Sequence, residues 1–258
     1  MINPKELSTD ELYFSDTHYM SVSRFKSFEK CEVGAMSERE EPSIPMLVGS
    51  YVDAYISGTL DKFKEEHPEI ISSRGATKVE LKADFKIVDD IIEKISNDRI
   101  FKQFLSGEKQ VVMTGEIKGV PTKIKIDSYS AGKAIVDLKI MASITNRSGS
   151  YYDFVGVWGY DLQLSIYQEI VRQNTGEQLP VYIAVATKEN PINTAIVYIP
   201  QVILDRALYR YESQVERFYK VMQGEIEPEG CGKCSACISK RTETPIISYE
   251  DLIGGEII

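Results

Sequence analysis

The residue types that could bind a divalent cation stand in one stretch near the middle of the chain. Residues 123–140 read KIKIDSYSAGKAIVDLKI, and in them aliphatic residues alternate with charged ones on both sides of Gly132. This period of two predicts two strands joined by a turn at Gly132. If the turn holds three or five residues, Asp127 lies directly opposite Asp137. A two-residue turn would slip the pairing by one and place the two carboxylates on opposite faces.

Two carboxylates that face each other across a strand pair repel unless something positive lies between them. A divalent cation bound by both would remove this repulsion. Lys139 shares a face of its strand with Asp137 and would add a second positive charge beside that cation. The spacing is therefore compatible with a metal site, and also with a surface hairpin whose charges are solvated.

The order of the motifs around this hairpin resembles the PD-(D/E)xK nuclease superfamily. Asp127, followed by Asp137-Leu138-Lys139 on the next strand, is similar to the metal motif of that superfamily. The flanking phrases resemble those of the exodeoxyribonuclease VIII-like enzymes of phages and prophages, which are related to the nuclease domains of bacterial helicase–nucleases. These phrases are residues 46–53 (MLVGSYVD), 119–121 (GVP) and 160–167 (YDLQLSIY). The resemblance extends from about Ser21 to Cys237.

This resemblance implies an α/β fold with a restriction-endonuclease-like core, in which helices flank a central mixed sheet. It also implies a deoxyribonuclease that depends on Mg²⁺ or Mn²⁺, with Asp127 and Asp137 as metal ligands. Lys139 would orient the attacking water or stabilise the charge of the phosphorane. The expected activity is that of an exonuclease on duplex DNA ends in phage-type recombination, where a single-strand annealing recombinase or further copies of the chain could be partners. The alternative is a non-catalytic DNA- or partner-binding protein that retains the fold.

The same resemblance adds three side chains to the expected site. Asp53 stands one helical turn after Gly49, where the related nucleases commonly have a metal-contacting histidine, and it would be a hard oxygen ligand instead. Gln163 and Tyr167 lie on the apolar face of a helix expected over residues 152–174. In the family this Gln-x-x-x-Tyr lies at the edge of the active site. A core hydrogen bond is the alternative role for Gln163, and a solvated charge is the alternative for Asp53.

Four cysteines form the second chemical signal. Cys231, Cys234 and Cys237 make two consecutive C-x-x-C steps, which in a cytosolic protein favour metal binding over disulfides. Cys31 is the one remaining cysteine and could supply a fourth thiolate. A lone N-terminal cysteine with a C-terminal trio resembles the iron–sulfur nucleases of the superfamily, where a [4Fe-4S] cluster joins the ends of the domain. The spacing departs from that pattern, so a Zn²⁺ ion or an empty site remains open.

Composition limits the classes of function that the chain can serve. Its 258 residues suit one α/β core, and its 30 Lys plus Arg against 39 Asp plus Glu give a formal net charge of -9. That balance argues against nonspecific wrapping of nucleic acid, although it permits a local basic groove. Residues 1–10 do not resemble a secretory signal, and there is no uncharged apolar run of 18 residues. We therefore expect a cytoplasmic protein that does not enter a membrane.

We expect an N-terminal arm over residues 1–20, a single nuclease-like domain over residues 21–240 and a C-terminal tail over residues 241–258. Ser21 is a candidate cap for the first helix, which carries Phe25 and Phe28 on its apolar face. Periodicity predicts the remaining elements. The expected helices cover residues 46–58, 78–95, 98–105, 152–174 and 201–223, and the expected strands outside the hairpin cover residues 111–117, 181–187 and 194–199.

Overall fold

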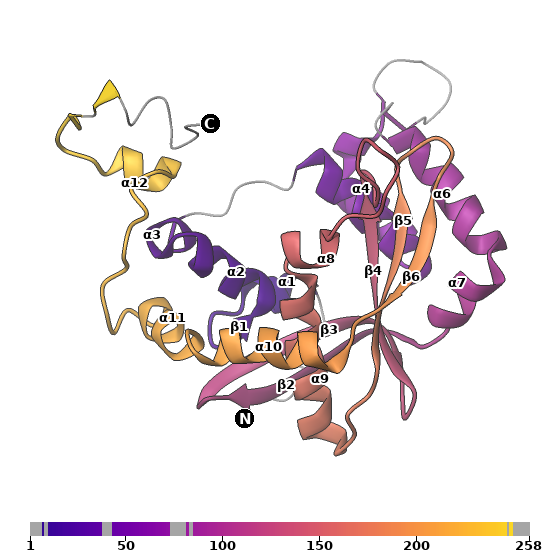
Figure 1. Ribbon diagram of the computed structural model, residues 1–258. Coiled ribbons are helices and arrows are strands. Elements are labelled where there is room, and N and C mark those ends of the chain that lie inside the picture. The colour runs from indigo at the N-terminus through magenta and orange to yellow at the C-terminus, as the bar shows by residue number, and fades with distance from the viewer. Residues whose placement is uncertain are drawn as a thin grey trace.

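The computed structural model describes residues 7, 10–37, 43–72, 81–82, 85–246 and 248–249. Its centre is a six-stranded mixed sheet in the order β1-β3-β4-β5-β6, with β2 paired to β3 outside this path (Figure 1). The β2–β3, β3–β4 and β5–β6 pairs are antiparallel, whereas β1–β3 and β4–β5 are parallel. The strands are β1 (Met20–Ser21), β2 (Glu108–Ile117), β3 (Val120–Ser130), β4 (Ala134–Met141), β5 (Val181–Thr187) and β6 (Thr194–Tyr198).

Helices cover both faces of the sheet, so the expected α/β architecture with a flanked mixed sheet is confirmed. The N-terminal helices are α1 (Asp10–Ser15), α2 (Val22–Lys30), α3 (Glu32–Ala35), α4 (Ile44–Ile56), α5 (Leu60–Glu66), the 3₁₀ turn η2 (Pro68–Ile70), α6 (Lys86–Asn97) and α7 (Arg99–Phe104). The later helices are α8 (Phe154–Val157), α9 (Tyr160–Thr175), α10 (Gln201–Glu212), α11 (Val215–Met222) and α12 (Ser235–Ser239). Among the described residues, no helix is both long enough and apolar enough to cross a membrane.

Two hydrophobic cores lie on the two faces of β4 and β5. Ile135 belongs to the core that also contains residues of α2, α9, α10 and α11. Val136 and Leu138 belong to the other core, together with residues of α4, α6 and α7. Because successive side chains of a strand point to opposite faces, Asp137 and Lys139 lie on the same face as Ile135, toward α9.

The start of the helical layer follows the expectation. Ser21 Oγ accepts the backbone N–H of Arg24 and caps α2, and Phe25 and Phe28 of that helix are buried. We expected residues 1–20 to form a separate N-terminal arm, but the described part of this segment packs against the domain. There the buried ammonium of Lys123 binds the backbone oxygen of Tyr13 and, at 3.0 Å, a carboxylate oxygen of Asp16.

Two helices that periodicity predicts as continuous are each broken. Residues 152–174 form α8 and α9, which are separated at Gly159, where φ is 63°. Residues 201–223 form α10 and α11, which are separated at Ser213 and Gln214. In both cases the apolar spacing continues through the break, so spacing alone could not reveal it. The helix expected over residues 78–95 begins partly outside the described residues, and its described part is α6.

Candidate active site and cysteine cluster

The β3–β4 hairpin has the register that a metal site requires. The pairs Ser128–Val136, Tyr129–Ile135 and Ser130–Ala134 leave a three-residue turn, residues 131–133. One further step in this register places Asp127 opposite Asp137, as expected for a turn of three residues. Pairing stops at that step, and Asp127 Oδ2 instead accepts the backbone N–H of Leu138 at 2.8 Å. The site therefore lies where β3 and β4 begin to separate.

Asp137 is the centre of the side-chain contacts at this point. It is 1% exposed, and its Oδ1 accepts a hydrogen bond of 2.7 Å from Gln163 Nε2. Its Oδ2 lies 2.5 Å from Lys139 Nζ but accepts no well-directed hydrogen bond. Gln163 Nε2 also donates to Tyr167 Oη at 3.1 Å. The structure thus brings Asp137, Lys139, Gln163 and Tyr167 together from β4 and α9.

The electrostatics of this group show an excess of buried negative charge. Burial, followed by the charges of Asp137 and Asp53, raises the pKa of Asp127 well above its usual range. Burial lowers the pKa of Lys139, but the carboxylates of Asp137 and Asp127 outweigh it and raise that pKa above its ordinary value. Burial also raises the pKa of Tyr167, which remains a neutral phenol. A bound cation would relieve the repulsion between the two aspartates.

Asp53 lies near these aspartates but has a partner of its own. It belongs to α4, and both of its carboxylate oxygens accept from Gln110 Nε2, at 3.0 and 2.9 Å. Gln110 lies within β2 with a left-handed backbone (φ 53°), and the register would pair it with Asp127, although that pair is missing from the ladder. The Oε1 atom of Gln110 is buried without a hydrogen-bond partner. Sequence reasoning did not find Gln110, because nothing in its neighbourhood marks a change of backbone conformation.

Sequence reasoning also missed two lysines and gave Tyr160 no role. Lys26 of α2 donates to the backbone oxygen of Trp158 at 2.9 Å, and its Nζ lies 5.5 Å from the ring centroid of Tyr160. Lys139 Nζ lies 5.1 Å from the same ring. The charge of Lys109 interacts with Asp127 and Asp53. No local pattern could assign Lys26, because the fold brings it to the site from more than 100 positions away in the sequence.

The residues present fit a hard divalent cation. The donors are carboxylate oxygens, which Mg²⁺ and Mn²⁺ prefer. Asp137 Oδ2 is buried beside Lys139 Nζ but accepts no well-directed hydrogen bond, and burial followed by the charges of Asp137 and Asp53 raises the pKa of Asp127. Asp127 and Asp137 are therefore the residues that would hold the ion. Asp53, Asp127 and Asp137 do not form a compact group of three ligands in the described part of the chain.

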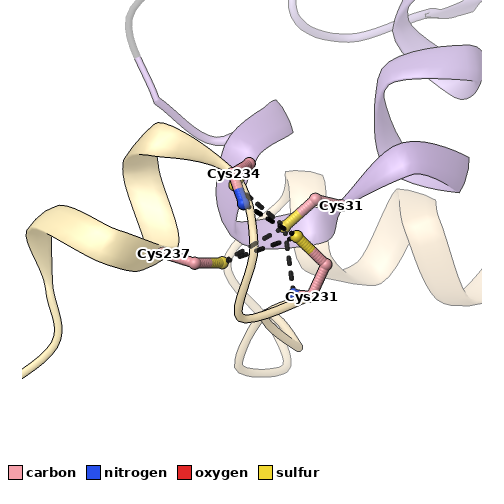
Figure 2. A group of neighbouring side chains, drawn as sticks. All are labelled: Cys31, Cys231, Cys234 and Cys237. Atoms are coloured by element: carbon pink, nitrogen blue, oxygen red, sulfur yellow. Dashed lines mark hydrogen bonds between the residues drawn. The ribbon is translucent and has the colours of Figure 1, made fainter. Parts of the chain in front are cut away.

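The four cysteines form a second and much tighter group (Figure 2). The Sγ atoms of Cys31, Cys231, Cys234 and Cys237 all lie within 4.8 Å of one another, and among the described residues no other group of three or more His, Cys, Asp or Glu side chains does so. Cys31 lies between α2 and α3, and backbone N–H groups, first that of Cys231, lower its pKa to about 6. Burial raises the pKa of Cys237 to about 11. The structure therefore brings the lone N-terminal cysteine to the C-terminal trio.

Comparisons with known proteins agree with this architecture. The family model for a PDDEXK-like domain of unknown function (DUF3799) matches residues 21–240. The crystal structure of an Eubacterium rectale protein described as a "putative exonuclease" aligns with a TM-score of 0.86 and 45% identity, over 96% of this chain and 98% of that chain. The structure of SSO0001 aligns with a TM-score of only 0.30 and 13% identity, over 76% of this chain and 87% of that chain, which is too distant to inform the fold.

No functionally curated protein matches the chain. The resemblance to the PD-(D/E)xK superfamily is confirmed by the family match and by the 45%-identical structure. The match spans the residues from the α2 cap to the end of the cysteine segment, and it therefore includes both the carboxylate site and the four cysteines. The chain belongs to the PDDEXK-like family DUF3799, and its domain is a nuclease-type domain.

Proposed function

We propose that the chain is an exodeoxyribonuclease that hydrolyses DNA from duplex ends with Mg²⁺ or Mn²⁺. The observation that carries this proposal is the buried carboxylate of Asp137, held between Lys139 and Gln163 where β3 and β4 separate beside Asp127. A pure binding surface has no need to bury Asp137 near Asp127, because Lys139 offsets only one of the two charges and burial with the charge of Asp137 raises the pKa of Asp127. The Eubacterium rectale relative, described as a "putative exonuclease", supports the same class of activity.

Each side chain has a defined task in this proposal. Asp127 and Asp137 would hold the divalent cation, which would supply Lewis-acid polarisation of the scissile phosphate and activation of the attacking water. Gln163 fixes the rotamer of Asp137 by its 2.7 Å hydrogen bond, and Tyr167 in turn holds Gln163. Lys139 remains protonated, so it acts as a positive charge that stabilises the phosphorane and not as a base.

The setting of the activity rests on the resemblance alone. It includes phage-type recombination in the cytoplasm, a single-strand annealing recombinase as the partner, and assembly of several copies of the chain. Asp53 takes the place of the family histidine as an additional ligand in this proposal, with Gln110 holding its carboxylate. The four cysteines form a separate metal centre, for which a [4Fe-4S] cluster and Zn²⁺ are the candidates.

A digestion assay that compares linear with closed circular duplex DNA tests the proposal directly. Wild-type protein with Mg²⁺ or Mn²⁺ should degrade the linear form progressively and leave the closed circle intact. Cleavage of the circle would show an endonuclease and overturn the exonuclease assignment. Protein that is inert on every form of DNA with either cation would favour a DNA- or partner-binding platform.

Three variants separate chemistry from metal binding in the same assay. Lys139→Ala should abolish hydrolysis but retain Mn²⁺ binding by titration calorimetry, because lysine is not a ligand. Asp137→Asn should lose both activity and metal affinity, since the amide carries no charge. Lys133→Ala, in the exposed turn of the same hairpin, is the matched control and should behave as the wild type. Full activity in Lys139→Ala would remove this lysine from the mechanism.

A further inference from the structure

We propose that the four cysteines hold one tetrahedral ion, most suitably Zn²⁺, and not the [4Fe-4S] cluster that the resemblance suggests. In this proposal the ion fixes the C-terminal segment, residues 230–241, to the α2–α3 corner of the N-terminal helices. The argument uses only the cysteine site and the segments around it, so it is independent of the proposed nuclease activity.

The spacing of the sulfur atoms is that of ligands around a single ion. A zinc ion binds thiolates at about 2.3 Å in a tetrahedron, which places neighbouring sulfurs about 3.8 Å apart. The Sγ atom of Cys31 lies 3.5 Å from that of Cys237 and 3.6 Å from that of Cys234, and the Cys231 and Cys237 sulfurs are 4.0 Å apart. All four atoms lie within 4.8 Å of one another.

A [4Fe-4S] cluster does not fit this spacing. Each of its four thiolates binds a different iron, and the irons and their bridging sulfides occupy the space between the ligands. The ligand sulfurs must therefore stand much farther apart than the ligands of one ion. Expansion to that size would require the two backbone segments that carry Cys31 and the trio to move apart.

The backbone around the sulfurs leaves little room for such an expansion. A Cβ atom at Gly230 would lie 3.1 Å from Cys237 Sγ and 3.5 Å from a methyl carbon of Val33, so only glycine fits there without a shift. A Cβ atom at Gly34 would lie 3.5 Å from Cys234 Sγ. The backbone N–H of Val33 also donates to the carbonyl of Glu229 at 3.3 Å, which ties the two segments together beside the site.

Backbone N–H groups are directed at two of the sulfurs, as the charge of four thiolates requires. Cys31 Sγ accepts from the N–H groups of Gly34 and Cys231, both at 3.3 Å. Cys231 Sγ accepts from Lys233 at 3.4 Å and from Cys234 at 3.3 Å. Gly232, with φ 71°, allows the tight turn that aims the last two donors at one sulfur. These bonds stabilise the deprotonated thiols that a metal ion needs.

The C-terminal segment has little else to hold it in place. Up to Glu229 the chain is anchored by the buried Glu32, which accepts from Arg217 at 2.7 and 2.9 Å and from the N–H of Glu229 at 2.7 Å. Beyond that point α12 has five residues, none of them buried, and a helix of this length is not stable alone. Binding of the ion is therefore the main source of free energy that orders this segment.

The position of the site argues for a structural role. Figure 1 shows α3 and α12 next to each other at the periphery of the molecule, away from β4, β5 and β6. Four protein thiolates also complete a tetrahedral zinc site and leave no open position for a substrate or water, as in other structural zinc sites.

Metal analysis of anaerobically purified full-length protein tests the proposal. We expect one zinc per chain, colourless protein and no acid-labile sulfide. Protein in which cobalt replaces zinc should show the intense visible absorption of tetrahedral Co²⁺ with thiolate ligands. Brown protein with iron and acid-labile sulfide would overturn the proposal in favour of a cluster, and thiols without any stoichiometric metal would overturn it in favour of an empty site.

Limited trypsin digestion provides a readout that does not depend on activity. Lys233, Lys240 and Arg241 lie in the C-terminal segment, so loss of the ion should expose them to cleavage. Cys237→Ser should lose zinc and become cleavable there, whereas Ser239→Ala, in the same helix, should keep both zinc and resistance. Chelation of the wild type should produce the same cleavage, and added Zn²⁺ should reverse it. A chelated wild type that stays resistant would contradict the role of the ion.

Discussion

The fold shifts the pKa values of two lysines at the candidate site, Lys139 and Lys26, in opposite directions. Lys139 lies against Asp137 and stays protonated, because the carboxylates raise its pKa above the ordinary value. Lys26 Nζ lies over the same Tyr160 ring, at 5.5 Å from its centroid, and donates a hydrogen bond to the backbone oxygen of Trp158. Burial, followed by the charge of Lys139, lowers the pKa of Lys26 to about 8, although Asp137 acts in the opposite direction. Lys26 is therefore a cation of the site whose charge changes near the pH of an assay.

This lowered pKa predicts a particular pH dependence of stability. An unfolded lysine titrates near pH 10.4, so between pH 8 and that value the unfolded chain binds a proton that the folded chain has released. The free energy of unfolding should therefore gain a contribution from Lys26 as pH rises through this window. Relative to Lys26→Met, the wild type should gain on the order of 2 kcal/mol between pH 8 and 10. Urea unfolding at several pH values measures the difference.

Lys30→Met, at an exposed position of the same helix, is the matched control. If the wild type and Lys26→Met keep a constant difference across this range, the ammonium of Lys26 is solvated and not buried beside Lys139.

At the scale of elements, the missing Gln110–Asp127 pair in the ladder between β2 and β3 positions the site. Before Asp127, Ile124 and Ile126 of β3 contribute to the core beneath α9. Beyond it, Ser128 Oγ instead contacts the carbonyl of Phe104 in α7, on the other side of the sheet. The left-handed residue Gln110 stands on β2 at this missing pair. The change of direction lets Asp127 reach the backbone of Leu138 on β4 while Gln110 reaches Asp53 on α4.

The backbone of Gln110 gives a measurable prediction. A left-handed backbone at a non-glycine residue lowers the stability of the fold by about 1 kcal/mol or more, whereas glycine adopts this conformation without that loss. Gln110→Gly and Gln110→Ala both lose the contact with Asp53, but only the glycine variant relieves the backbone. We expect Gln110→Gly to be the more stable of the two by about 1 kcal/mol in chemical denaturation. This order is the reverse of the usual preference within a strand.

The alanine variant is thus the control for the lost side chain. A more stable Gln110→Ala would mean that the backbone of β2 does not keep its left-handed residue in solution.

These elements also show which parts of the structure the sequence could predict. Local alternation predicted the hairpin but left its register to the length of the turn at Gly132, which holds three residues, and the α2 cap followed from Ser21. The break at Gly159 could not be predicted from spacing, because the apolar spacing continues through it. The left-handed residue Gln110 could not be predicted either, because it follows Glu108 and Lys109, ahead of the strand expected over residues 111–117, where no apolar alternation marks a strand. The contacts of Lys26 and Gln110 with the site depend on how distant elements pack, and a single sequence carries no local signal for them.

At the scale of the whole molecule, charge is distributed unevenly. The chain has a formal net charge of -9, which opposes general attraction to DNA. Lys26, Lys109 and Lys139 nevertheless come together near the aspartates from α2, β2 and β4. The fold thus places three lysines around Asp53, Asp127 and Asp137, so their charges offset those of the aspartates on an otherwise acidic molecule. A divalent cation at Asp127 and Asp137 would then make the local charge positive.

This distribution predicts how DNA binding responds to salt. The logarithm of the binding constant falls with the logarithm of salt concentration by about 0.9 for each phosphate neutralised, so three lysines give a slope of about -3. Duplex binding measured with Ca²⁺, to prevent cleavage, should show this shallow slope at neutral pH, and Lys109→Met should reduce it by about 1. Removal of the divalent cation should abolish binding, because the uncompensated aspartates repel phosphate. A slope of about -6 or steeper, or tight binding in EDTA, would locate the DNA-binding surface away from these lysines.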